Sequence, residues 1–208
     1  MIKKIMAVSV LGVSALGMMA ANATTNGIYV TGQAGYADTH MKNSLSFTRV
    51  PGSKPMPNGG LAGRLAIGYQ FNSNLAVELG YLQMSKLKSI SPQAPNYLRT
   101  SLAFRQNAID VAAKGILPLN DKFNVYGKLG VAYLTNDTTI SSKSIKYNDN
   151  KALGLAQHNW APEAGVGASY NVTPNAFIDT SWTHIQPLGK NRPNNVDFVS
   201  VGIGYSFG

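Results

Sequence analysis

The sequence predicts an all-β protein, an eight-stranded antiparallel transmembrane up-and-down β-barrel. Three observations lead to this prediction. Eight segments alternate between apolar residues and small or polar residues, the connections between them are alternately short and long, and aromatic residues of the apolar face gather near both ends of the segments. Alternation with a period of two indicates strands whose two faces meet different surroundings. Short turns on one rim and long loops on the other are typical of a membrane barrel.

The chain begins with a stretch typical of a secretory signal peptide. Lys3 and Lys4 precede an uncharged run over residues 5–20, and Ala21 and Ala23 offer a small-residue cleavage site. The run is shorter than the roughly 20 apolar residues that a spanning helix requires. The sequence has no cysteine, so an exported domain would gain no stability from disulfides. The predicted division is a signal peptide over residues 1–23 and one barrel domain over residues 24–208.

Each of the eight alternating segments is as long as a tilted membrane strand of about 9–11 residues, or slightly longer. The predicted strands are residues 27–37, 60–71, 74–84, 102–117, 122–135, 157–171, 175–186 and 195–207. Short connections follow the second, fourth and sixth strands, and long ones follow the first, third, fifth and seventh. We call the end with short connections the turn rim and the opposite end the loop rim.

The apolar face carries two groups of aromatic residues. Near the turn rim these are Tyr69, Phe71, Phe123, Tyr170, Tyr205 and Phe207, and near the loop rim they are Tyr36, Tyr81, Tyr133, Trp160 and Trp182. Two such girdles are expected where a barrel meets the two membrane–water interfaces. Tyr126, Phe177 and Phe198 fall on the opposite face and do not fit this sorting.

The opposite face consists mostly of small residues with a few charges. Seven charged residues are predicted to point into the lumen: Arg64, Glu78, Asp110, Lys114, Lys128, Glu163 and Asp179. An eight-stranded barrel is only wide enough for side chains to fill its interior, and a buried charge is costly unless it is paired. We therefore predict a plug of ion pairs and hydrogen bonds. The alternative is a narrow gated channel for ions or small solutes, in which these pairs exchange partners.

Basic residues predominate in the long loops and the adjoining strand ends. They are Lys42, Arg49, Lys54, Lys86, Lys88, Arg99, Arg105, Lys143, Lys146, Lys151, Lys190 and Arg192, against four acidic residues, Asp38, Asp137, Asp149 and Asp197. Lysine and arginine recognise phosphate groups, so we expect this basic outer rim to contact lipopolysaccharide. Acidic host or extracellular polymers are the alternative partner. Nucleic acid is not expected, because export removes the chain from it.

Three histidines are the residues to test for catalysis or metal binding: His40, His158 and His184. A histidine base requires a nucleophile and an orienting carboxylate within hydrogen-bond reach, and no hydrolase or acyltransferase motif accompanies these three. Dispersed histidines without cysteine also lack metal-ligand spacing. We expect no catalytic residue, no metal and no cofactor, and a lipid-modifying enzyme remains the third hypothesis after an interaction protein and a channel.

The signal peptide, the eight strands, the glycine-rich alternation and the closing "VGIGYSFG" resemble the small outer-membrane β-barrel family of Gram-negative bacteria. This family includes the OmpA transmembrane domain and opacity-type surface antigens. The resemblance implies an outer-membrane barrel and names a fold better than a function. We expect extracellular long loops, periplasmic termini and a structural or surface-interaction role, such as an adhesin or antigen. The resemblance also implies that Tyr205 and Phe207 form a signal for the barrel assembly machinery, although Gly208 departs from the usual aromatic ending.

Overall fold

The computed structural model describes residues 27–40, 57–90, 100–142, 146–148, 158–188 and 194–207, so the predicted signal peptide lies outside it. These residues form ten strands of one antiparallel sheet. The strands are β1 (Gly27–Asp38), β2 (Gly59–Asn72), β3 (Leu75–Met84), β4 (Leu87–Ile90), β5 (Thr100–Pro118), β6 (Phe123–Ser142), β7 (Lys146–Asn148), β8 (His158–Asn171), β9 (Ala176–Ile185) and β10 (Val196–Ser206). Among the described residues there is no helix with the length and apolarity needed to cross a bilayer.

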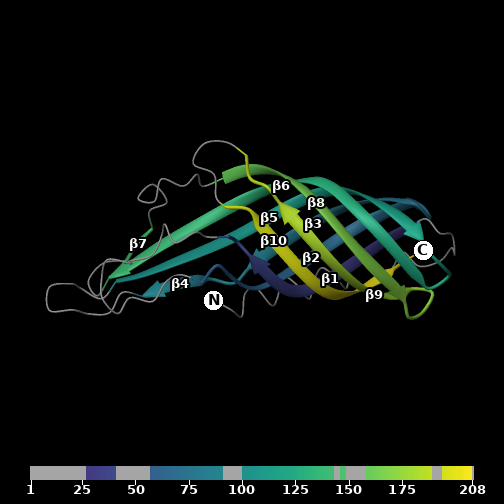
Figure 1. Ribbon diagram of the computed structural model, residues 1–208, viewed down its shortest axis with the longest axis horizontal. Helices are drawn as coiled ribbons and strands as arrows, with labels where there is room; N and C mark the ends of the chain where they lie inside the picture. Colours follow the sequence, from purple (N-terminus) through teal and green to yellow (C-terminus); the bar gives the residue numbers. More distant parts are fainter. Residues whose placement is uncertain are drawn as a thin grey trace.

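Eight of the strands close into a barrel. They follow the order β1-β2-β3-β5-β6-β8-β9-β10, and β10 pairs with β1 to complete the ring. The short strands β4 and β7 extend the wall beyond β3 and β8, along the long β5–β6 hairpin (Figure 1). The predicted eight-stranded antiparallel barrel is therefore confirmed.

The strand boundaries agree with the prediction to within two residues except in β6. The sequence predicts that this strand ends at residue 135, whereas β6 continues to Ser142. The segment Thr135–Ser142 is polar, so it resembles a loop when judged by apolar alternation. It is nevertheless a strand, because it pairs with the first residues of β5 on one side and with β7 on the other. The short strands β4 and β7 were likewise not predicted.

Side chains at the turn rim cap the backbone of the connecting turns. The Asn72 side-chain oxygen accepts hydrogen bonds from the amides of Asn74 and Leu75, at 2.8 and 2.9 Å. Asn120 caps the β5–β6 turn in the same way. Such side-chain hydrogen bonds satisfy backbone amides that a tight turn leaves without a backbone partner. These residues thus fix where each strand ends and the next begins.

The outward face of the barrel is a continuous apolar surface. Large side chains such as Leu129 and Ile203 are 72% and 71% exposed. In water this band would be an aggregation hazard, whereas in a bilayer lipid covers it. The aromatic residues near the two rims include exposed contact pairs, with ring centroids 5.1 Å apart for Tyr69 and Phe71. The apolar face is therefore the lipid-facing wall.

Tyr126 and Phe177, two of the three aromatic residues that broke the sorting, point into the lumen, as Tyr29 does, and each of these three lies directly opposite a glycine. The cross-strand pairs are Tyr29 with Gly68, Tyr126 with Gly167, and Phe177 with Gly204. A methyl group added at any of these glycines would lie 2.1–2.4 Å from a ring carbon. The glycines of this face therefore make room for rings that fill the barrel.

Candidate functional site

All seven charged residues assigned to the inward face are buried in the lumen, with exposed fractions of 1–5%. They come from six strands: Arg64 on β2, Glu78 on β3, Asp110 and Lys114 on β5, Lys128 on β6, Glu163 on β8 and Asp179 on β9. We call these seven residues the lumen network. The closed ring of strands, rather than any local motif, brings them together.

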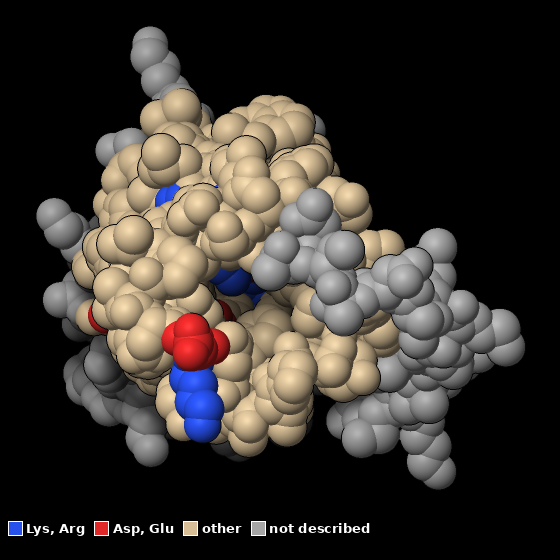
Figure 2. Space-filling view, turned by 90° about the vertical axis from the view of Figure 1, so that its right-hand side faces the viewer, with Lys and Arg blue, Asp and Glu red and all other residues tan. Residues whose placement is uncertain are grey.

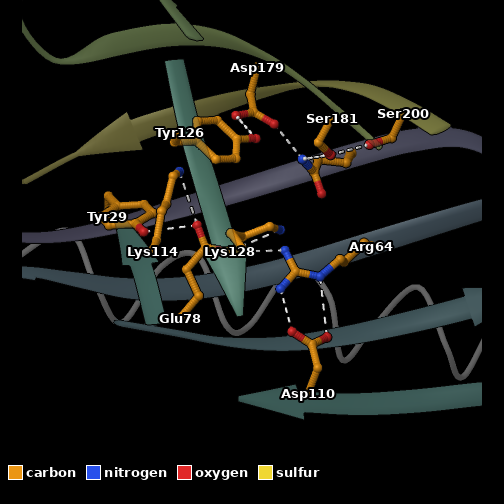
Figure 3. Close-up of polar contacts among 11 residues, drawn as sticks. Tyr29, Arg64, Glu78, Asp110, Lys114, Tyr126, Lys128, Asp179, Ser181 and Ser200 are labelled. Atoms are coloured by element: carbon orange, nitrogen blue, oxygen red, sulfur yellow. Dashed lines mark hydrogen bonds and ion pairs between the residues drawn. The ribbon is translucent and has the colours of Figure 1, made fainter. Parts of the chain in front are cut away.

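Glu78 is the centre of the lumen network. Its carboxylate oxygens lie 3.3 Å from Arg64 Nη1, 3.1 Å from Lys114 Nζ and 3.6 Å from Lys128 Nζ. The Tyr29 hydroxyl also donates a hydrogen bond to this carboxylate at 2.9 Å (Figure 3). One buried anion thus stabilises three buried cations.

Arg64 also binds a second carboxylate through two nitrogens. Its Nε donates to Asp110 Oδ2 at 3.2 Å and its Nη2 donates to Asp110 Oδ1, the fork geometry that makes arginine–carboxylate pairs strong. Gly80 faces Asp110 across the β3–β5 pairing. A Cβ at Gly80 would lie 2.4 Å from Arg64 Nη2, so glycine leaves the space that this fork occupies.

Asp179 forms a second branch of contacts, in which the hydrogen-bond donors are uncharged side chains. It accepts a hydrogen bond from the Tyr126 hydroxyl at 2.7 Å and another from Gln33 Nε2. Gln33 Nε2 continues this branch to Ser181 at 3.3 Å (Figure 3). The Tyr126 ring lies 4.0 Å from Lys114 Nζ, a distance favourable for a cation–π contact. Lys114 therefore links the two branches.

Glu163 differs from the other three lumen carboxylates. It is 3% exposed, and its Oε1 has no hydrogen-bond partner. Within the described part of the chain, it forms no ion pair, whereas Glu78 forms three and Asp110 forms one. Glu163 is thus a member of the lumen network that takes no part in its ion pairs.

Between the lumen network and the loop rim, the interior contains a buried apolar band that was not predicted from the sequence. The buried cluster comprises Ala37, Ala62, Leu82, Met84, Ala108, Ala132, Leu134, Ala161, Ile185, Val196 and Phe198. We call it the apolar layer. The signal was in the sequence, because Leu82 shares the face of Glu78 and Leu134 shares that of Lys128. The apolar layer therefore lies between the lumen network and buried polar side chains nearer the loop rim, such as Gln106 and Asn136.

The structure describes only part of the basic outer rim. Lys86 is exposed and Arg105 is half-buried, while Lys88 and Lys146 lie on β4 and β7. The remaining basic residues assigned to the rim lie outside the described residues: Lys42, Arg49, Lys54, Arg99, Lys143, Lys151, Lys190 and Arg192.

Two of the three histidines meet at one carboxylate of the loop rim. Asp197 Oδ1 lies 2.8 Å from His184 Nδ1 and accepts a hydrogen bond from Trp182 Nε1 at 3.1 Å. Asp197 Oδ2 lies 3.4 Å from His40 Nδ1. This cluster connects the chain just beyond β1 with the loop-rim ends of β9 and β10. Its contacts therefore hold these three parts of the chain together at the loop rim.

His158 lies apart from that cluster. Its ring stacks on Tyr133, with centroids 5.4 Å apart and an interplanar angle of 10°. Its Nδ1 lies 3.4 Å from the Thr135 hydroxyl. Across the described ranges, no three His, Asp or Glu side chains are arranged to hold a metal ion.

The sequence of the chain matches a known family over nearly its whole length. The model of the OmpA-like transmembrane domain matches residues 23–208. The chain belongs to the OmpA-like transmembrane domain family. This confirms the resemblance found in the sequence, and the barrel is therefore a protein of the bacterial outer membrane.

Relatives and solved structures agree with this family. An uncharacterized protein of Coxiella burnetii is 29% identical, over 89% of this chain and 87% of its own length. Outer membrane protein P5 of Haemophilus influenzae is 26% identical over 99% of this chain, which spans 60% of P5. Among solved structures, Neisserial surface protein A has a TM-score of 0.56 at 19% identity, over 86% of this chain and 97% of its own.

A further structural neighbour was solved with a bound ligand. Ail, the attachment invasion locus protein of Yersinia pestis, has a TM-score of 0.53 at 17% identity, covering 87% of this chain and 99% of its own. That structure is a complex with the heparin analogue sucrose octasulfate. At this identity the likeness concerns the fold alone.

Proposed function

We propose that this OmpA-like barrel is a surface-interaction protein whose basic outer rim contacts the phosphate groups of lipopolysaccharide. The observation that carries the proposal is the separation of charge within the chain. The lumen network contains three basic and four acidic residues, and nearly all of them are used in contacts inside the barrel. The excess of basic residues therefore belongs to the loops and strand ends.

The geometry of the loop rim supports this role. β4 and β7 lengthen the wall around the β5–β6 hairpin and place Lys88 and Lys146 on its strands. Lipopolysaccharide forms the outer leaflet into which the extracellular end of such a barrel projects. Cationic side chains near an anionic membrane surface contribute about 1 kcal/mol each to attraction.

A second candidate partner is a sulfated or otherwise acidic extracellular polymer. The observation that favours it is the fold shared with Ail, which was solved with a heparin analogue. Sulfate and phosphate are recognised by the same cationic groups. The two partners can be separated, because an added sulfated polymer would compete with lipopolysaccharide only if both occupy the basic rim.

We propose no catalytic role for the histidines. His184 is held between Asp197 and Gln186, with its Nε2 3.3 Å from the Gln186 side-chain oxygen, so its second nitrogen faces an amide and not a hydroxyl or thiol. The named relatives, P5 and OmpA, are outer membrane proteins by description. The seven buried charges act as a structural plug in this account, with assembly directed by Tyr205 and Phe207.

Neutralising the rim tests the proposal. A variant with Lys86, Lys88, Lys143 and Lys146 all changed to Gln should bind lipopolysaccharide-containing vesicles on the order of several hundred-fold more weakly. The measurement is titration of the purified barrel in nanodiscs with vesicles, repeated with dephosphorylated lipid A. The variant should bind more weakly than the wild type to vesicles with phosphorylated lipid A, and the two proteins should bind equally to vesicles with dephosphorylated lipid A.

Two controls accompany this titration. The same four positions changed to Arg keep the charge and should retain binding. Lys122→Gln at the turn rim, where the side chain is exposed, should have no effect. Equal binding by the Gln variant and the wild type would show that the rim charges do not mediate contact.

A further inference from the structure

We propose that the apolar layer is the permeability seal of this barrel, placed in series with the lumen network. The inference does not rest on the proposed lipopolysaccharide contact. It assigns the barrier against ions to a ring of buried hydrocarbon and not to the ion pairs below it. Rearrangement of the ion pairs alone therefore opens no path through the barrel.

The first argument is that the apolar layer is complete around the ring. Its eleven members come from all eight barrel strands, and each is 0–7% exposed. The large side chains reach in from several directions, with Leu82 and Met84 on β3, Leu134 on β6, Ile185 on β9 and Phe198 on β10. Every barrel strand thus contributes at least one apolar side chain to the layer.

The second argument is the position of the layer along each strand. On β3, Leu82 lies on the loop-rim side of Glu78, and on β6 Leu134 lies on the loop-rim side of Lys128. The same order holds on β8, where Ala161 precedes Glu163. On each of the six strands that carry the lumen network, the charged residue lies on the turn-rim side of the layer residue of the same strand.

The two ends of the lumen are consequently unlike. Figure 2 looks at the turn rim and shows a hollow at the centre, with atoms of basic residues visible inside it. An ion entering here can exchange contacts with the lumen network. To continue, it must shed its water in passing a layer whose eleven side chains are all apolar, and hydrophobic constrictions exclude ions by dewetting.

Planar-bilayer recording with three variants tests the proposal. Glu78→Ala breaks the lumen network, the pair Leu134→Ser and Phe198→Ser breaks the apolar layer, and a third protein carries all three changes. We expect the wild type and Glu78→Ala to give no conductance above the bilayer baseline. The triple variant should conduct at least tenfold above that baseline.

The alternatives give different recordings. If Glu78→Ala alone conducts, the ion pairs are the barrier and the proposal is overturned. If the triple variant is silent although it is folded, as judged by the mobility shift of unheated samples in SDS gels, the apolar layer is not the remaining barrier and the proposal is again overturned.

Thiol labelling gives a second readout that requires no conducting state. The chain has no cysteine, so Ser200→Cys introduces a single thiol directly beneath Phe198. A charged methanethiosulfonate reagent added from the loop-rim side should not label this thiol in the Glu78→Ala protein. It should label it in the protein that also carries Leu134→Ser and Phe198→Ser.

The sidedness is controlled in the same vesicles. Protease digestion of the loops identifies barrels with the loop rim outward, and His158→Cys, which is exposed at that rim, should label in every background. Labelling of Ser200→Cys from the loop side with the apolar layer intact would contradict the seal.

Discussion

Glu78 and Glu163 are buried carboxylates with opposite surroundings, although both are 3% exposed. Glu78 has three cations and a tyrosine hydroxyl around it. Glu163 has an unpartnered oxygen and forms no ion pair with the described residues. The same substitution at the two sites should therefore have unequal effects on stability.

Glu78→Gln removes the anion that Lys114 and Lys128 share. Breaking a buried pair while its partner charges remain costs about 3–5 kcal/mol, so we expect a loss of that size in the free energy of unfolding. Glu163→Gln removes a carboxylate that forms no ion pair within the described residues, and it should change stability by less than about 1 kcal/mol or increase it. Urea unfolding in lipid vesicles measures both. Equal losses would mean that Glu163 is paired as strongly as Glu78.

At the scale of a strand, β10 closes the barrel. It pairs with β1 along ten residues, and the amide of Phe207 donates a hydrogen bond to the Ile28 carbonyl at 2.8 Å. The Phe207 ring lies 5.0 Å from that of Tyr205. The ring thus packs on the outer wall at the turn rim, and the lumen does not depend on it.

Phe207→Ala should therefore separate assembly from stability. If Phe207 is part of a signal for the assembly machinery, the variant will reach the outer membrane in reduced amount while refolding normally in vesicles. Phe207→Tyr, which keeps an aromatic ring, should assemble like the wild type. The measurement is the amount of folded barrel in outer-membrane fractions, judged by its mobility shift in unheated SDS gels. This amount is compared with the yield of refolding in vesicles. Unchanged amounts of the Ala variant in the outer membrane would remove Phe207 from the signal.

The strands also show what sequence alone can provide. Alternation predicts the eight barrel strands because lipid and lumen impose different residues on each face. It misses the outer half of β6, since Thr135–Ser142 is polar on both faces. The apolar layer was not predicted, because the whole inward face was treated as polar although it carries apolar side chains near the loop rim.

Other contacts of the site depend on register between strands distant in sequence. Asp197 meets His184 because β10 pairs with β9 at that position, and His40 approaches it from the end of β1. Likewise, Gly80 accommodates the Arg64–Asp110 fork only after β2, β3 and β5 are aligned. No local pattern around these residues contains that information.

At the scale of the whole molecule, the two ends of the barrel have different proposed tasks. The loop rim bears the proposed contact surface above the apolar layer, and the turn rim opens onto the lumen network (Figures 1 and 2). Binding at the loops and closure of the lumen are thus independent of one another. The proposed contact with lipopolysaccharide requires that the long loops face outward from the cell.

Surface accessibility of epitope tags tests that requirement most directly. Tags inserted near Lys54 or Ser144 should be cleaved by protease on intact cells. A tag beside Asn120, in the exposed β5–β6 turn, should be cleaved only after the outer membrane is permeabilised. If the loop tags are protected on intact cells while the turn tag is cleaved, the orientation of the barrel is the reverse of the one proposed here.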